Sequence, residues 1–137
     1  MLYDPLTCTC LNLRAASRRV SRRFDHIMAP AGLVGSQYSM LNFIAAKPAC
    51  GVGELADWLD MDVSTVTRNL RPLQKDGHIT IRSSVSDGRR REVRLTAKGR
   101  RALDRARPLW EDAQSAVIEE LGERRWQKLL KLLKAIA

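Results

Sequence analysis

Residues 63–99 read VSTVTRNLRPLQKDGHITIRSSVSDGRRREVRLTAKG, and this stretch decides the fold. Its apolar residues first recur three and four positions apart, at Val63, Val66, Leu70 and Leu73. This spacing predicts an amphipathic helix from Val63 to Lys75 with one buried face. Asp62 or Ser64 can cap its N-terminus, and Gly77 can adopt the left-handed conformation that ends it.

The period of the pattern then changes from that of a helix to that of a strand. Residues 78–82 and 91–95 alternate between apolar and polar side chains, and Asp87-Gly88 between them is a hairpin turn signal. We therefore predict a two-stranded ribbon with a basic tip. Thr96 is placed to cap a long helix that follows the ribbon.

Helical spacing also extends outward from this centre. It predicts a helix from Leu13 to Pro30 with Leu13 and Val20 on its apolar face. It also predicts shorter helices over 36–46 and 52–59, the second with Trp58 on its apolar face. Gly122 separates the long helix from a last one. Pro72 and Pro108 lie inside predicted helices, where they favour bends over breaks because the apolar stripes continue through them. Alternatively, the central helix ends near Arg71 and restarts.

The polar face of the helix over 63–75 suits the major groove of DNA. Small hydrogen-bonding groups precede guanidinium groups on it, at Ser64, Thr65, Thr67, Arg68, Asn69 and Arg71. Short hydroxyls let a backbone approach phosphates or base edges, while arginine can bond guanine O6 and N7 bidentately. With the preceding helix and its tight turn, this makes a helix-turn-helix. Taken alone, the pattern also fits an ordinary solvated helix face.

The ribbon strengthens this interpretation because its tip carries Arg89, Arg90 and Arg91. Like charges at such a tip repel one another in a free monomer. Against DNA the same cluster releases counterions, and an arginine at a narrow tip can enter a minor groove. A solvated basic turn is the weaker interpretation beside such a helix.

Composition agrees with a basic, folded protein of one domain. The 137 residues are 45% hydrophobic and 28% charged, with a formal net charge of +9 and a sequence pI of about 10.2. Nucleic acid, an anionic membrane surface or an acidic protein would all suit that charge. We expect no membrane span and no signal peptide, and hence a cytoplasmic protein.

We do not expect an enzyme. His26 and His78 are far apart and lack partners at catalytic or metal-ligand spacing, and no phosphate-loop or nucleophile motif occurs. We therefore expect no catalytic residue, metal or cofactor. A non-specific basic nucleic-acid-binding protein remains an alternative, although the chain lacks the aromatic stacking residues of many RNA-binding sheets.

The run from Asp87 to Gly99, DGRRREVRLTAKG, resembles the wing and following helix start of the multiple antibiotic resistance regulator (MarR) family. That family shows Asp-x-Arg, a short strand and then Leu-Thr-x-x-Gly. Agreement in order and spacing extends to Gln37-Tyr38, Glu54-Leu55-Ala56 and Ser64-Thr65-Val66-Thr67-Arg68. The resemblance implies a mainly α, bacterial, dimeric winged helix-turn-helix regulator of about six helices and a hairpin wing.

The same resemblance implies binding to double-stranded DNA and repression that a small effector or thiol oxidation relieves. Arg89 matches the wing-tip arginine of the family, and Ser64, Thr65, Thr67 and Arg68 match its recognition-helix contacts. We therefore expect a regulator that binds a pseudo-palindromic operator.

The terminal helices carry more apolar surface than one chain of this size buries. Leu129, Leu130, Leu132 and Leu133 cover more than one helix face, which indicates two packing partners. We predict a single domain over 1–137, with a winged helix-turn-helix core at 36–96 and homodimerisation helices at 1–30 and 97–137.

Cys8 and Cys10, just before the first predicted helix, are candidates for a redox switch. On a helix they would point to different sides, but each could approach a cysteine of a second subunit at a dimer interface, where Arg14 and later arginines favour the thiolate. A small-molecule switch is the preferred alternative, with these thiols then serving in packing. Cys50, in a predicted loop, looks structural.

Overall fold

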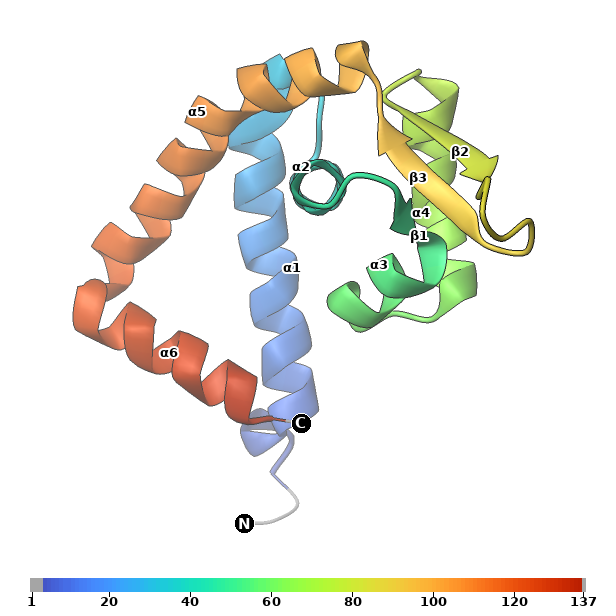
Figure 1. Cartoon of the computed structure of the whole chain (residues 1–137). Coiled ribbons are helices and arrows are strands. Elements are labelled where there is room, and N and C mark those ends of the chain that lie inside the picture. Colours follow the sequence, from blue (N-terminus) through green and yellow to red (C-terminus); the bar gives the residue numbers. More distant parts are fainter. Residues whose placement is uncertain (1–3, 137) are drawn as a thin grey trace.

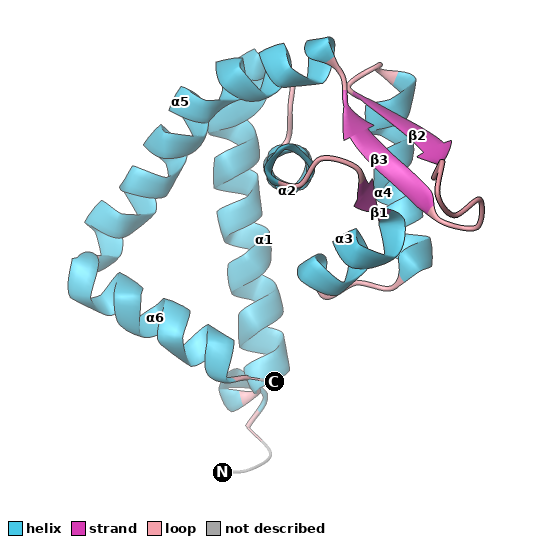
Figure 2. Ribbon diagram, viewed as in Figure 1, coloured by secondary structure: helices cyan, strands magenta, loops and turns pink. Residues whose placement is uncertain are grey.

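The computed structural model describes residues 4–136, so the ends of the predicted domain at 1–3 and 137 lie outside the described residues. Helices dominate, and three short strands form one small sheet (Figure 2). The helices are α1 (Thr9–Met28), α2 (Gly35–Ala46), α3 (Val52–Leu59), α4 (Val63–Lys75), α5 (Ala97–Leu121) and α6 (Glu123–Ala135). The strands are β1 (Cys50–Gly51), β2 (Ile79–Ser83) and β3 (Arg91–Leu95). Short 3-10 helices cover Pro5–Thr7 and Ala29–Ala31.

The elements form two lobes joined through α2 and the start of α5 (Figure 1). One lobe holds α3, α4 and the sheet, and the other holds α1, most of α5 and α6. A single aliphatic core runs beneath α2, α4 and the beginning of α5, where Leu41, Ile44, Leu70, Leu73 and Leu103 have 1% or less of their surface exposed. This burial fixes α4 and the sheet relative to the helical lobe.

The sheet has three antiparallel strands in the order β1-β3-β2, so the prediction of a two-stranded ribbon was incomplete. Ile81 lies opposite Val93 in the β2–β3 pair, and Cys50 lies opposite the same Val93 in the β1–β3 pair. Cys50 is therefore a buried strand residue, and its placement in a loop was wrong. A strand of two residues is too short to show an alternating pattern, which is why it was missed.

Helix α4 begins and ends where the sequence predicts, with one change to its buried face. Val66, Leu70 and Leu73 are fully buried, but Val63 is 53% exposed because the first turn extends beyond the core. Both α4 and α5 run unbroken through their prolines, Pro72 and Pro108, so the alternative of an interrupted α4 was wrong. Figure 1 shows α5 changing direction along its length, as a helix with an internal proline does.

Helix α1 begins at Thr9, four residues earlier than predicted, so Cys10 lies inside it. Its predicted apolar face is largely uncovered: Leu13 is 37% and Val20 41% exposed. Trp58 of α3 is also exposed, at 42%, where an inward position was expected, and its ring packs beside Phe43.

No helix among residues 4–136 is both long and apolar enough to cross a membrane.

Candidate nucleic-acid interface

The N-terminus of α4 is held by Asp62, which resolves the choice between two predicted caps. Its Oδ1 accepts hydrogen bonds from the Thr65 backbone N–H at 2.7 Å and from the Ser64 hydroxyl at 2.8 Å. The hydrogen bonds from Thr65, and then from Ser64, lower the pKa of Asp62 from 3.8 to about 2. An ionised cap therefore fixes the first turn of the helix at neutral pH.

The polar residues predicted to contact DNA lie on the solvent side of α4. Ser64, Arg68, Asn69 and Arg71 are exposed, while Thr65 and Thr67 are half-buried. The Thr67 hydroxyl donates to the Val63 carbonyl oxygen at 2.7 Å. The Ser64 hydroxyl donates to the N-cap and the Thr67 hydroxyl donates within the helix, so both hydroxyl oxygens keep their lone pairs for outside donors.

The wing is the hairpin of β2 and β3 together with the loop of residues 84–90 that joins them. The Asp87 carbonyl oxygen accepts from the Arg90 N–H at 3.0 Å, and the Asp87 carboxylate accepts from the Arg89 N–H at 3.1 Å. Ser84 closes the base of the loop by donating its N–H to the Arg90 carbonyl oxygen at 2.7 Å. These bonds give the arginine-bearing tip a defined shape without using an arginine side chain.

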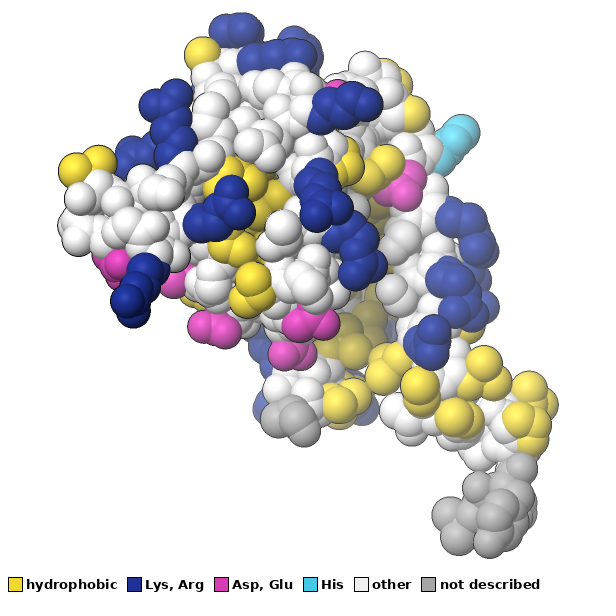
Figure 3. Space-filling model, turned by 90° about the vertical axis from the view of Figure 1, so that its right-hand side faces the viewer, with side chains coloured by type: hydrophobic (Ala, Val, Ile, Leu, Met, Phe, Trp, Pro, Cys, Tyr) yellow, Lys and Arg dark blue, Asp and Glu magenta, His cyan; other side chains and the backbone are white. Residues whose placement is uncertain are grey.

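A groove of about 670 Å³ separates α4 from the wing and brings part of the predicted site together. Thr67 and Arg71 of α4 line one side, and the three wing arginines line the other, above a floor that includes Leu70 and Ile81. Figure 3 shows Lys and Arg side chains spread over this side of the molecule around an apolar patch. Such an arrangement can hold a polyanion by its phosphates while a helix contacts it.

The remaining predicted contacts on α4 lie outside that groove. Arg68 and Asn69 line a second groove of about 320 Å³ between α4 and α2, and Asn69 Nδ2 lies 3.9 Å from Met61 Sδ. The α4 surface therefore has two flanks, one shared with the wing and one shared with α2.

Arg90 differs from its two neighbours in the wing. Its Nη2 donates to the Ala49 carbonyl oxygen at 3.2 Å and forms an ion pair with Glu54 of α3. Sequence reasoning missed this role for Glu54, which also binds Lys47. No periodic signal could have revealed it, because Arg90 and Glu54 are 36 positions apart in the chain.

The two candidate redox cysteines lie far along the chain from this interface, at the start of α1. Cys8 is the N-cap residue, whose Sγ accepts a hydrogen bond from the Leu11 N–H at 3.5 Å. Both Cys8 and Cys10 are exposed and free. Within residues 4–136, no three His, Cys, Asp or Glu side chains cluster in a way that could hold a metal ion.

His78 is the one buried histidine among the described residues. Burial, and then the charge of Lys98, lower the pKa of His78, and its Nδ1 has no hydrogen-bond partner among the described residues. It lies at the junction of α4 and β2, where its backbone carbonyl oxygen accepts from the Thr96 N–H at 3.0 Å. This position indicates a structural residue.

Comparison with known proteins places these features in one family. The model of the MarR family matches residues 31–90, which include α2, α3, α4, β2 and most of the wing. The HTH-type transcriptional regulator BilQ of Clostridium symbiosum is 30% identical over 94 residues, which is 69% of this chain and 65% of that protein.

Solved structures resemble the whole chain. The M. tuberculosis transcriptional regulator MosR, in complex with DNA, is 33% identical with a TM-score of 0.83 and covers 93% of this chain and 95% of its own. The transcriptional repressor CouR, bound to a 23-mer DNA duplex, is 29% identical with a TM-score of 0.86 and covers 99% of this chain and 96% of its own. CouR has also been solved bound to p-coumaroyl-CoA. That structure is 28% identical with a TM-score of 0.83, and the match covers 94% of this chain and 91% of CouR.

Proposed function

Because the chain belongs to the MarR family of DNA-binding transcription regulators, which are not enzymes, we propose that it is a homodimeric repressor released from its operator by a small effector. Each subunit inserts α4 into a major groove and directs its wing toward the adjoining minor groove. The observation that carries this proposal is the groove in which Thr67 and Arg71 of α4 face the wing arginines.

Within this proposal the two flanks of α4 have different tasks. Arg68 and Asn69, on the flank toward α2, read base edges, because bidentate arginine and asparagine contacts distinguish base pairs. Arg71, Arg89 and Arg91 surround the other flank, where their charges suit phosphates and a narrow minor groove. Ser64, Thr65 and Thr67 supply short polar contacts near the N-terminus of the helix.

The helical lobe supports the assignment of residues 1–30 and 97–137 to dimerisation. Large apolar side chains that stay exposed at this end of the chain include Leu132 of α6, at 55%, and Ile136 just after α6, at 61%. Another groove, on the helical lobe and also of about 670 Å³, lies between α1 and the corner of α5 and α6. Val20, Val117 and Leu129 are among its lining residues. A partner's helices would bury these surfaces, as an amphipathic helix requires.

A smaller groove is our candidate for the effector site. It measures about 300 Å³ and lies where α1, α2 and α5 meet, lined by Phe24, Ser36, Ser39 and Trp110 among others. Asp25 Oδ1 accepts the Gly35 N–H there at 2.8 Å, which ties α1 to α2. The binding of p-coumaroyl-CoA by the similar repressor CouR supports a small-molecule switch in this chain.

A thiol switch is the second candidate for release. The observation that favours it is the exposure of both Cys8 and Cys10 on a segment that continues into the uncovered face of α1. Oxidation could then link a cysteine of one subunit to a cysteine of the other. If peroxide releases the wild type from DNA but not the Cys8→Ser, Cys10→Ser variant, these thiols are the sensor; equal release of both excludes them.

The test of the proposed function is selection of a binding site by the protein itself. The wild-type chain is used to enrich duplexes from a random library, and its affinity for the enriched duplex is compared with that for a shuffled duplex of equal length. We expect at least about a thousandfold preference at physiological salt, as sequence-specific regulators show. Equal affinity for both duplexes would instead indicate the non-specific basic binder.

A further inference from the structure

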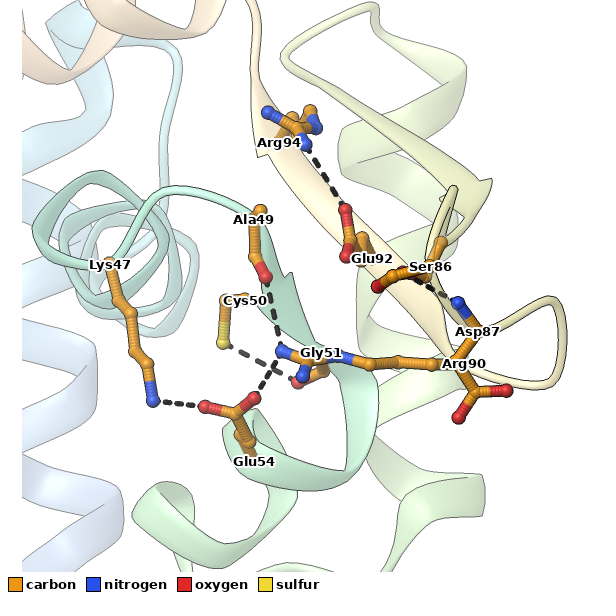
Figure 4. A network of polar contacts seen from close by, with 11 residues as sticks. Lys47, Ala49, Cys50, Gly51, Glu54, Ser86, Asp87, Arg90, Glu92 and Arg94 are labelled. Atoms are coloured by element: carbon orange, nitrogen blue, oxygen red, sulfur yellow. Dashed lines mark hydrogen bonds and ion pairs between the residues drawn. The ribbon is translucent and has the colours of Figure 1, made fainter.

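The guanidinium of Arg90 points back into the protein, although Arg90 lies in the wing. It contacts the Ala49 carbonyl oxygen at 3.2 Å and one carboxylate oxygen of Glu54, while Lys47 Nζ binds the other oxygen (Figure 4). One carboxylate therefore joins the end of the wing to α3 and to the C-terminal end of α2. We call these three residues, Lys47, Glu54 and Arg90, the wing clasp.

The backbone beneath the wing clasp is shaped to admit it. A Cβ atom on residue 51 would lie 3.1 Å from Arg90 Nε and 3.4 Å from Arg90 Cζ, so glycine at this position leaves the space that the guanidinium occupies. Gly51 also pairs with Glu92 of β3, two residues beyond Arg90. The clasp and the short β1–β3 pairing thus hold the same end of the wing.

Lys47 connects the wing clasp to α2. Its ammonium lies 4.9 Å from the centre of the Trp58 ring, and that ring packs against Phe43 of α2 with 5.7 Å between centroids. Interactions with Lys47 and then with Arg90 lower the pKa of Glu54, so its carboxylate is ionised at neutral pH. Two cations therefore share one anion, and each of the three groups is oriented by more than one contact.

We propose that Glu54 is a positioning residue for DNA binding: through Arg90 it holds the wing at a fixed distance from α4. This inference rests on the proposed function. An acidic side chain that lines a DNA-binding groove repels phosphates, so its electrostatic effect alone weakens binding. A positioning role offsets that repulsion, because a wing that is already fixed loses less conformational freedom when DNA binds.

The two effects have opposite signs, and this makes the proposal testable with Glu54→Gln. If the carboxylate acts only as a negative charge, its removal tightens binding to DNA. If it positions the wing, removal weakens binding to the enriched duplex by about three- to tenfold, a coupling of the size that contacting residues show. Asp57→Asn is the matched control, because it removes one negative charge from an exposed position of the same helix and leaves the clasp intact.

A double-variant cycle and a salt titration complete the design. We expect Arg90→Gln to weaken binding as much as Glu54→Gln and the double variant to be no weaker than either one. We also expect Arg90→Gln to leave the salt dependence of binding unchanged, because its guanidinium is on Glu54 and not on a phosphate. Glu54→Asp keeps the charge but withdraws the carboxylate by one methylene, and it should weaken binding too.

Failure of this inference can be told apart from failure of the proposed function. Wild-type protein that prefers no duplex would remove the proposed function itself. With wild-type preference established, Glu54→Gln or Glu54→Asp binding as tightly as Asp57→Asn would overturn the positioning role. Additive losses from Glu54→Gln and Arg90→Gln, or a salt slope reduced by about one in Arg90→Gln, would also overturn it, the latter by making Arg90 a phosphate contact.

Discussion

The backbone carbonyl oxygen of His78 lies 2.1 Å from the position that a Cβ atom on Gly99 would occupy. This close approach packs the start of α5 against the end of α4, where Thr96 Oγ1 also donates to the Gly77 carbonyl oxygen at 2.6 Å. The spacing Leu95-Thr96-x-x-Gly99 therefore has a physical reason. Threonine caps α5, and glycine three residues later lets the helix approach the backbone of His78, the residue just before β2.

We predict that Gly99→Ala destabilises the fold by about 3 kcal/mol or more, the upper end of overpacking costs, because its methyl group meets backbone and not a flexible side chain. Denaturant unfolding measures the loss. The control is Gly53→Ala in α3, where the new Cβ has no neighbour within 4 Å. That variant should be neutral or more stable by up to about 1 kcal/mol, and equal losses in both would refute the account of Gly99.

Asp62 predicts a pH dependence of stability with a defined sign. Its pKa is about 2 in the folded chain against an ordinary 3.8. Its contribution to the free energy of unfolding is therefore complete above pH 3.8 and is lost as the pH falls toward 2. Asp62→Asn keeps a capping oxygen but cannot titrate. It should therefore make the stability of the fold depend less on pH between 3.8 and 2. Thermal melts of both proteins between pH 5 and pH 2 give the comparison. Parallel profiles would show that the cap carboxylate is not the titrating group.

Arg68 tests base recognition by α4. If it bonds a guanine edge, Arg68→Ala should cost about 1–3 kcal/mol in binding and relax specificity at one position per half-site. Selection of duplexes by the variant measures the change in preference. Lys75→Ala, at the exposed C-terminal end of α4, is the control and should leave the preferred sequence unchanged. An unchanged preference in Arg68→Ala would remove this residue from base readout.

The wing tip tests phosphate binding. Arg91→Gln should lower the slope of log affinity against log salt by about one, because one fewer counterion is released. Arg89→Ala should weaken binding most on duplexes with an A/T-rich flank, where the minor groove is narrow. Titrations at several salt concentrations on duplexes with either flank give both values. Wild-type affinities in both variants would exclude the wing from the interface.

The sequence predicted the helices of the core well because their buried residues follow one face. Val66, Leu70 and Leu73 lie on the core side of α4 as their spacing indicates, and Asp62, Thr96 and Gly122 mark helix ends through local capping. Val63 was misplaced because helical spacing says which face a residue shares and not how far the core extends along the helix.

Contacts between distant segments could not be predicted in the same way. The arginine cluster at the wing was visible as composition, and all three arginines are exposed. All three line the groove, but that Arg90 also turns back onto Glu54 depends on how β1 brings the start of α3 beside β3. No feature local to residues 89–91 distinguishes the three.

The most direct test of the central claim, a homodimer that reads two half-sites through α4 and the wing, is the effect of half-site spacing. Two α4 helices related by two-fold symmetry should contact half-sites about one DNA turn apart, roughly 34–36 Å. Inserting about five base pairs at the centre of the enriched duplex turns one half-site to the opposite face of the helix. The control protein carries Leu129→Glu and Leu133→Glu on the uncovered face of α6 and should be monomeric by sedimentation. We predict that the insertion reduces wild-type binding to the level of the monomeric variant, whereas undiminished wild-type binding would contradict the account.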